Sequence, residues 1–490
     1  MDVIIETKHG KIKGFQKDDH QEFLGIRYAK PPVGKLRFQK PQPSEPWEGI
    51  YDATKYGPIA PQAWQDDPPI KMEESEDCLF LNIYTPWTDD KGRPVMFYIH
   101  GGALAIGSGS RRRLYGGKLA EHGDVVVVTI QYRLGILGFL DADGILPNLG
   151  LQDQVCALQW VKDNIRVFGG DPDNVTIFGQ SAGGTSVSYL LVMPQAKGLF
   201  HRAIAQSGSI PLFSENPSEE LLLNLKVKQG DVEALQALTL EQLIAAQKKI
   251  TGGDIFSGRL FYPVTDGTII PGNVYEALAS EFARDVPLLI GVNEDEVPIF
   301  GYFLKSWYKR YIGKFFVNRF FKKKYGLEKR SIKQFLEFYR KNLVKTGHVP
   351  NKEYDKLLTD VIFRIPAIKQ AEIHSSASSG TYFYIFTHKA PRIDSAVHIL
   401  ELFFIFGTLD TDDVSRDMQP AGSEEDKQLA KKMMDTWVTF ARTGNPSHPS
   451  LPEWPAYDTE KRATMVLDTS PRVINMPTEE ERAIWGEYLL

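Results

Sequence analysis

The chain has 490 residues, of which 42% are hydrophobic and 24% are charged, and its formal net charge is −5. This composition is typical of a folded globular protein, and the small negative charge argues against a nucleic-acid partner. No stretch approaches the roughly 20 apolar residues of a membrane-spanning helix, and the first residues lack the basic start and apolar run of a secretory signal. We therefore expect a cytoplasmic protein without stable membrane insertion, although a secreted form that has lost its signal would look the same.

Three short β-branched runs in the first 180 residues each end in glycine or polar residues. They are residues 95–99 (VMFYI), 125–130 (VVVVTI) and 175–178 (VTIF). Apolar runs of this length are typical of strands that are buried on both faces of a parallel sheet. Between the second and third runs, Leu151, Val155, Leu158 and Val161 recur at roughly helical spacing. Strand, helix and strand in this order predict a right-handed crossover unit.

Two further strand ends, PLLI at 287–290 and YFYIF at 382–386, lie in the second half of the chain. Residues 216–250 have the pattern of amphipathic helices, whereas residues 301–345 mix many basic and aromatic side chains. The latter segment fits a lid or a membrane-surface helix, or an amphipathic helix whose aromatic side chains pack inward. Because no repeat or linker interrupts the chain, we predict one α/β domain over residues 1–490, with helical insertions at roughly 210–260 and 300–360.

The strongest local signal is the sequence GQSAG, which follows the third strand and precedes a helix-forming stretch. It is a G-x-S-x-G nucleophile elbow in the required context of strand, turn and helix. Larger side chains at Gly179 and Gly183 would collide with neighbouring backbone in such a tight turn. The turn presents the hydroxyl of Ser181 at a helix N-terminus, where the helix dipole favours developing negative charge.

A second signal, HGGA at residues 100–103, directly follows the first strand about 80 residues upstream. Small residues here let backbone N–H groups point into a pocket, where they form an oxyanion hole with the N–H of the residue after the nucleophile. HGG alone is also compatible with an ordinary glycine turn. In this order with the elbow, it predicts a serine hydrolase of the α/β-hydrolase fold.

A serine nucleophile needs a histidine base, and that histidine needs a carboxylate. The histidines downstream of the elbow are His201, His348, His374, His388, His398 and His448. His398 lies beside an apolar run after a strand and suits the role of the base, whereas His448 in NPSHPS is typical of a surface turn. Three candidate acids follow the PLLIG strand, and their spacing does not choose between them: Glu294, Asp295 and Glu296.

The only cysteines are Cys78 and Cys156. Neither lies in a CxxC motif or near a histidine cluster, which argues against a disulfide scaffold and a structural zinc site. We expect no metal and no cofactor, and a small-molecule ester as the binding partner.

Several long stretches resemble one family. GIRYAKPPVGKLRF, SEDCLFLNIYTP, HGGA, GDPDNVTIFGQSAGG and WVTFARTGNPS resemble the type-B carboxylesterases and cholinesterases, and among these most of all the bacterial para-nitrobenzyl esterases. The resemblance extends from about residue 5 to residue 460. It implies the α/β-hydrolase fold, a mostly parallel twisted sheet flanked by helices, and a serine carboxylesterase that is monomeric, bacterial and independent of cofactors.

The resemblance also implies site residues. The catalytic triad it implies is Ser181, Glu296 and His398. The oxyanion hole it implies is made by the N–H groups of Gly102, Ala103 and Ala182, with Gly101 shaping the loop. It further implies two structural ion pairs, Arg37 with Glu76 and Arg133 with Asp153. The same serine chemistry also fits an acyltransferase, a lipase or an amidase, and more remotely the family contains non-catalytic adhesion or scaffold proteins.

The chain departs from the family pattern at four positions: Gln180 replaces a usual glutamate, Leu104 an aromatic residue, Val297 a glycine, and Ala60 a cysteine found in some relatives. The first two bear on substrate preference, the third bears on the turn that carries the acid, and the fourth favours a reduced protein. We also predict that Arg111, Arg112 and Arg113 lie near the active-site entrance and attract anionic esters. The alternative is an ordinary run of solvated charges.

Overall fold

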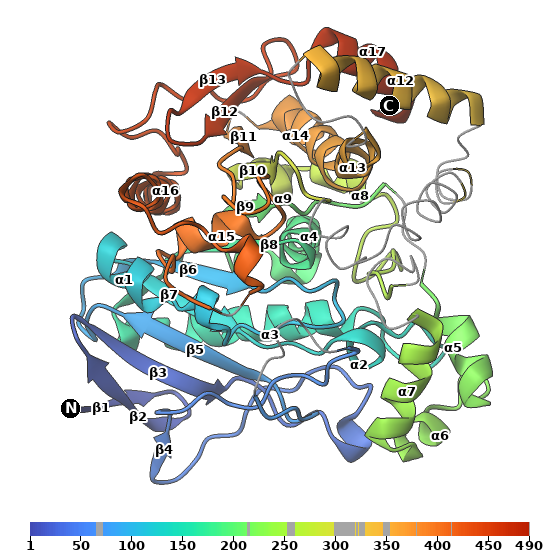
Figure 1. Ribbon diagram of the computed structural model, residues 1–490. Helices are drawn as coiled ribbons and strands as arrows, with labels where there is room; N and C mark the ends of the chain where they lie inside the picture. The colour runs from blue at the N-terminus through green and yellow to red at the C-terminus, as the bar shows by residue number, and fades with distance from the viewer. Residues whose placement is uncertain are drawn as a thin grey trace.

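The computed structural model describes residues 1–64, 72–212, 216–251, 260–297, 319, 322, 329–345, 353–378, 380–412 and 414–489. Strands from both ends of the sequence join one 13-stranded sheet, in the order β1-β2-β3-β5-β7-β6-β8-β9-β10-β11-β12-β13, with β4 paired to β2 (Figure 1). The strands are β1 Asp2–Thr7, β2 Gly10–Lys17, β3 His20–Arg27, β4 Ile50–Asp52, β5 Phe80–Thr85, β6 Arg93–Ile99, β7 Val126–Ile130, β8 Gly170–Gln180, β9 Arg202–Gln206, β10 Leu288–Asn293, β11 Thr381–Phe386, β12 Ala463–Leu467 and β13 Arg472–Asn475.

The middle of the sheet is parallel. Strands β7, β6, β8, β9, β10, β11 and β12 run in one direction. The edges are mostly antiparallel, with β1, β2, β3 and β5 on one side and β13 on the other. All five apolar runs of the sequence fall in parallel strands, namely β6, β7, β8, β10 and β11. The predicted mostly parallel central sheet is therefore present.

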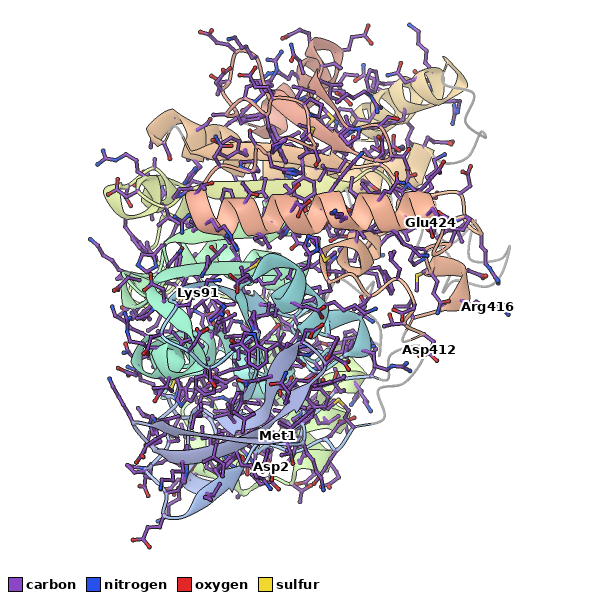
Figure 2. All side chains as sticks on the ribbon, turned by 90° about the vertical axis from the view of Figure 1, so that its left-hand side faces the viewer. Met1, Asp2, Lys91, Asp412, Arg416 and Glu424 are labelled. Carbon is purple, nitrogen blue, oxygen red and sulfur yellow. The ribbon has the colours of Figure 1, made fainter. Side chains whose placement is uncertain are left out.

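Helices cover both faces of the sheet, which explains why the central strands carry continuous apolar runs. The core on one face includes side chains of α3 (Leu149–Asn164), α4 (Ala182–Leu190) and α14 (Ile365–Ala377). The core on the other face includes α1 (Gly117–Gly123), α15 (Leu400–Ile405) and α16 (Glu424–Thr443). Figure 2 shows α16 lying along the outside of the molecule from its first residue, Glu424.

The remaining helices lie mostly in the segments that connect the later strands. They are α2 Gly135–Phe139, α5 Ser218–Leu225, α6 Val232–Ala237, α7 Leu240–Thr251, α8 Val274–Leu278, α9 Glu281–Arg284, α12 Lys329–Lys345, α13 Glu353–Thr359 and α17 Glu479–Leu489. A π-helical turn, Asp360–Arg364, joins α13 to α14. The amphipathic stretch at 216–250 is indeed helical, as α5, α6 and α7. The basic aromatic segment lies largely outside the described residues, so its two interpretations stay predictions.

Both predicted ion pairs are present. The guanidinium of Arg37 donates two hydrogen bonds to Glu76, at 2.6 and 2.5 Å. Arg133 Nη2 lies 2.7 Å from Asp153 Oδ1, and both side chains are almost fully buried. Arg37 also donates to the carbonyls of Gln236 and Leu238, which ties the insertion between β9 and β10 to the N-terminal part of the chain. None of the described helices is long and apolar enough to cross a membrane.

Candidate active site

The GQSAG sequence forms the predicted sharp turn between a strand and a helix. Strand β8 ends at Gln180, helix α4 begins at Ala182, and Ser181 between them has φ 57° and ψ −125°. Positive φ is costly for a residue with a side chain, and such strain concentrates at functional sites. A Cβ atom at Gly183 would lie 2.0 Å from the carbonyl oxygen of Ile99. The glycine is therefore needed for the helix to approach β6 this closely.

The HGGA loop packs directly against the nucleophile. A Cβ atom at Gly101 would lie 3.0 Å from the Cβ atom of Ser181. The loop is strained, because Ala103 and Leu104 have φ 56° and 58°. Within the part of the chain that the structure describes, no acceptor is found for the backbone N–H groups of Gly102, Ala103 and Ala182. Unpaired backbone donors beside the nucleophile are what an oxyanion hole requires.

His100 fixes the shape of this loop. Burial lowers the pKa of His100 to about 4, so its ring is neutral at neutral pH. Its Nδ1 lies 2.8 Å from the carbonyl oxygen of Gly101, to which it donates a hydrogen bond. The hydroxyl of Tyr132 donates to the carbonyl of His100 at 2.8 Å, and the two rings stack with their centroids 4.4 Å apart. His100 therefore has a structural role beside the oxyanion loop.

The three candidate acids point in different directions. Glu296 Oε2 lies 2.6 Å from His398 Nδ1, and the Glu296 side chain is completely buried. Asp295 and Glu294 instead face Lys356 of α13, whose Nζ lies 2.9 and 3.9 Å from their carboxylate oxygens. Val297 does not have positive φ, so the turn does not force this β-branched residue into the left-handed region. The structure thus brings Glu296, and neither neighbour, to His398.

The other candidate bases that the structure describes are engaged elsewhere. His374 bonds Thr381 and the carbonyl of Ala283, His388 bonds Asp426, and His448 bonds Thr436. His201 Nδ1 accepts from the backbone N–H of Val175 at 3.1 Å. His348 lies outside the described residues.

Gln180 packs against the ring of His398. Its Nε2 lies 3.3 Å from Nδ1 and 3.2 Å from Nε2 of the imidazole. An atom this near to both nitrogens would collide with Cε1 if it lay in the ring plane, so the amide lies over the ring face. The ring of Phe363 also contacts the imidazole, with 4.9 Å between centroids. Among the hydrogen bonds between described residues, none joins Ser181 Oγ to His398, which contacts Gln180 and Glu296. Such catalytic bonds often tighten only when substrate is bound.

This contact predicts the effect of restoring the usual glutamate at position 180. In Gln180→Glu a carboxylate would lie against the imidazole and stabilise its protonated form. We expect the acidic limb of the kcat/KM profile to move to higher pH by roughly one unit, with the alkaline plateau largely retained. The pH dependence of kcat/KM for a neutral ester measures this shift, and Gln154→Glu on α3 serves as a control. An unshifted limb would contradict the contact.

The three consecutive arginines are not an ordinary run of solvated charges, because Arg111 is buried. Their predicted place near the active-site entrance stays a prediction. Arg111 is buried, whereas Arg112 is exposed and forms an ion pair with Asp412. Asp412 lies at the edge of the molecule, in the segment before α16 (Figure 2). The backbone carbonyl of Arg113 accepts from Thr408. The chain turns through a 3-10 helix here, which sends neighbouring side chains in different directions.

Comparison with known proteins identifies similarity along almost the entire chain. The sequence matches the Carboxylesterase family over residues 1–485. It is 38% identical to the para-nitrobenzyl esterase of Bacillus subtilis (strain 168), covering 98% of this chain and 97% of that protein. It is 36% identical to carboxylesterase 1D of Mus musculus, covering 99% and 93%. A solved carboxylesterase structure from Geobacillus stearothermophilus superposes with a TM-score of 0.85 at 36% identity, covering 98% of this chain and 99% of that one.

Proposed function

This chain belongs to the carboxylesterase family and is a carboxylic ester hydrolase, and we propose that Ser181 is its nucleophile, His398 its general base and Glu296 the carboxylate that orients the base. The observation that carries the assignment is the 2.6 Å contact between Glu296 Oε2 and His398 Nδ1. The imidazole also contacts Gln180, the residue that immediately precedes the strained Ser181. Hydrolysis of small soluble esters by the purified protein, compared with matching amides and emulsified lipids, tests the substrate class.

The proposed reaction proceeds through an acyl-enzyme. Ser181 Oγ attacks the ester carbonyl carbon while His398 Nε2 takes the hydroxyl proton. The carbonyl oxygen becomes an oxyanion, which accepts hydrogen bonds from the N–H groups of Gly102, Ala103 and Ala182. His398 then gives the proton to the leaving alcohol as the carbon–oxygen bond breaks. Water attacks the acyl-enzyme by the same steps, which releases the carboxylic acid and restores Ser181.

Glu296 sets the tautomer of the base. Because Nδ1 of His398 donates to the carboxylate, the lone pair of Nε2 is available for the serine proton. The second carboxylate oxygen, Oε1, accepts the backbone N–H of Asn293 at 2.8 Å. This bond holds the carboxylate in one orientation, so the acid enters the reaction already positioned.

We expect activity to rise with pH through one limb in the histidine range. His398 must be neutral to accept the serine proton, so protonation of its imidazole at low pH removes the base. The measurement is kcat/KM against pH with a neutral substrate. In His398→Gln, any residual hydrolysis should no longer show this limb. If the limb persisted in that variant, another group would be the base.

We propose that residues 1–490 act as one monomeric domain in the reducing cytoplasm of a bacterium, without metal or cofactor. In support of one domain, the described strands share one sheet. Cys78 is a buried thiol that packs in the same core as Ala60, and Cys156 is also unpaired. Among the described residues, no three histidine, cysteine or acidic side chains are grouped so as to hold a metal ion.

A further inference from the structure

A second carboxyl group is buried beneath the proposed triad. Glu401 lies in α15, three residues after His398, and is fully buried. Its neighbours in this helix, Leu400 and residues 402–405, are all buried apolar side chains. A carboxyl group in such surroundings is costly unless polar partners compensate it. Its partners therefore indicate why it is there.

The first partner, Asn293, links the acid to the segment of the base. Asn293 is the last residue of β10, and its backbone N–H is the donor to Glu296 Oε1. Its side-chain Nδ2 donates to Glu401 Oε2 at 2.7 Å and to the carbonyl of Val397 at 2.7 Å. Val397 immediately precedes His398. Asn293 thus binds Glu296 through its backbone N–H. Its side-chain amide binds both Val397, next to His398, and the carboxylate of Glu401.

The second partner of Glu401, Gln206, is hydrogen-bonded to the backbone of the proposed nucleophile. Gln206 is the last residue of β9, and its backbone carbonyl accepts the N–H of Ser181 at 2.8 Å. Its Nε2 lies 3.4 Å from Glu401 Oε1, which is a long hydrogen bond. Its Oε1 accepts from the indole N–H of Trp437 on α16 at 3.2 Å, which fixes the orientation of the amide. Glu401 therefore connects with all three segments of the proposed site.

We propose that Glu401 is a positioning residue of this esterase, which joins the segments that carry Ser181, Glu296 and His398 through hydrogen bonds with Gln206 and Asn293. This inference rests on the proposed function. Glu401 acts through other residues and does not touch the substrate. Small displacements of reacting groups are expensive, since a 1 Å misplacement can cost about 10²-fold in rate. A group that fixes three segments relative to one another therefore acts on kcat.

The protonation of Glu401 gives this role a measurable signature. Burial, together with the nearby Glu296 carboxylate, raises the pKa of Glu401 to about 7. The titratable groups that face it are Glu296, His398, Tyr384 and Tyr98. As pH rises through the Glu401 titration, a second negative charge forms beside Glu296 and His398. That charge favours the imidazolium form of the base, so a variant without the charge should favour the neutral imidazole.

The test compares Glu401→Gln and Glu401→Leu with the wild type, with Glu76→Gln as a control that removes a carboxylate outside this network. For each we would measure kcat and KM across the pH range, the thermal midpoint, and labelling by a serine-reactive phosphonate. Glu401→Gln keeps an acceptor for Asn293 but cannot ionise. It should retain kcat within about tenfold, and the acidic limb of its kcat/KM profile should shift to lower pH by roughly one unit. Glu401→Leu should lose about 10²-fold in kcat with KM little changed.

Wild-type kcat and an unchanged pH profile in both variants would overturn the proposal. If Glu401→Leu fails to fold, the pH profile of Glu401→Gln still decides, because a purely structural carboxyl would leave that profile unchanged. The wild-type control separates this inference from the proposed function. Absence of ester hydrolysis in the wild type would reject the function itself, whereas an active wild type with insensitive variants rejects only the role of Glu401.

Discussion

Ser181→Ala is expected to abolish ester hydrolysis while the protein stays folded. Loss of the nucleophile removes the only atom that can form the acyl-enzyme, and in serine hydrolases this costs on the order of 10⁶ in kcat. The fold should tolerate the change, because the hydrogen bond from position 181 to Gln206 uses the backbone N–H. Alanine also keeps the single Cβ atom that the positive φ of this turn already accommodates.

The measurements are kcat, the thermal midpoint and mass-spectrometric identification of the serine that a phosphonate modifies. Wild type should be labelled stoichiometrically at position 181, and the variant should not be labelled. A suitable control is Ser186→Ala on the same helix, whose hydroxyl accepts from Gln154 at 3.1 Å. That control should retain activity. Retained hydrolysis in Ser181→Ala, with labelling at another serine, would reject the proposed nucleophile.

The parts of the fold that the sequence predicts correctly are those where sterics leave little choice. The strands β6, β7, β8, β10 and β11 are short apolar runs because helices cover both faces of the sheet at those places. The elbow is recognisable because Gly183 has no room for a Cβ atom beside Ile99. Both signals are local, so a single sequence is sufficient to find them.

Other features depend on contacts that are distant in sequence. The choice among the three acids depends on Lys356, about 60 residues later in the sequence. Lys356 forms ion pairs with Asp295 and Glu294. Of the three acids, only Glu296 contacts His398. Neither strand pattern nor spacing contains that information. The start of helix α16 has a local sequence signal, because Ser423 and Asp426 form a capping box before a periodic apolar face.

Glu401 illustrates a different kind of missed signal. The sequence LELFFI at residues 400–405 is typical of a buried segment. From the sequence alone, its single acidic residue, Glu401, would be assigned to an exposed position. The structure shows that this position is as buried as its neighbours. An acidic residue within an otherwise apolar helix, three residues after the candidate base His398, is a sequence signal for a buried functional carboxyl group. Which groups it contacts follows only from the meeting of β9, β10 and α15.

Glu296→Gln is expected to lower kcat by roughly 10³ to 10⁴, because the amide disturbs the tautomer of His398. The carboxylate accepts a hydrogen bond from Nδ1 at 2.6 Å, whereas an amide NH₂ group in that place would donate to Nδ1. The proton would then move to Nε2, which could no longer accept the proton of Ser181. The side chain keeps its size and the backbone N–H of Asn293 keeps an acceptor, so the fold should be little affected.

The matched controls are the two neighbouring acids, assayed in parallel as Glu294→Gln and Asp295→Asn. Asp295 is nearly buried and pairs with Lys356 at 2.9 Å, so its amide variant should lose about 1–3 kcal/mol of stability. It should nevertheless keep kcat near that of the wild type, as should Glu294→Gln. The assay is kcat for one soluble ester at a pH on the alkaline plateau, with thermal midpoints measured alongside. If Glu296→Gln stayed near wild type while Asp295→Asn collapsed, the assignment of the acid would be wrong, and His398 would have to turn toward Asp295 during the reaction.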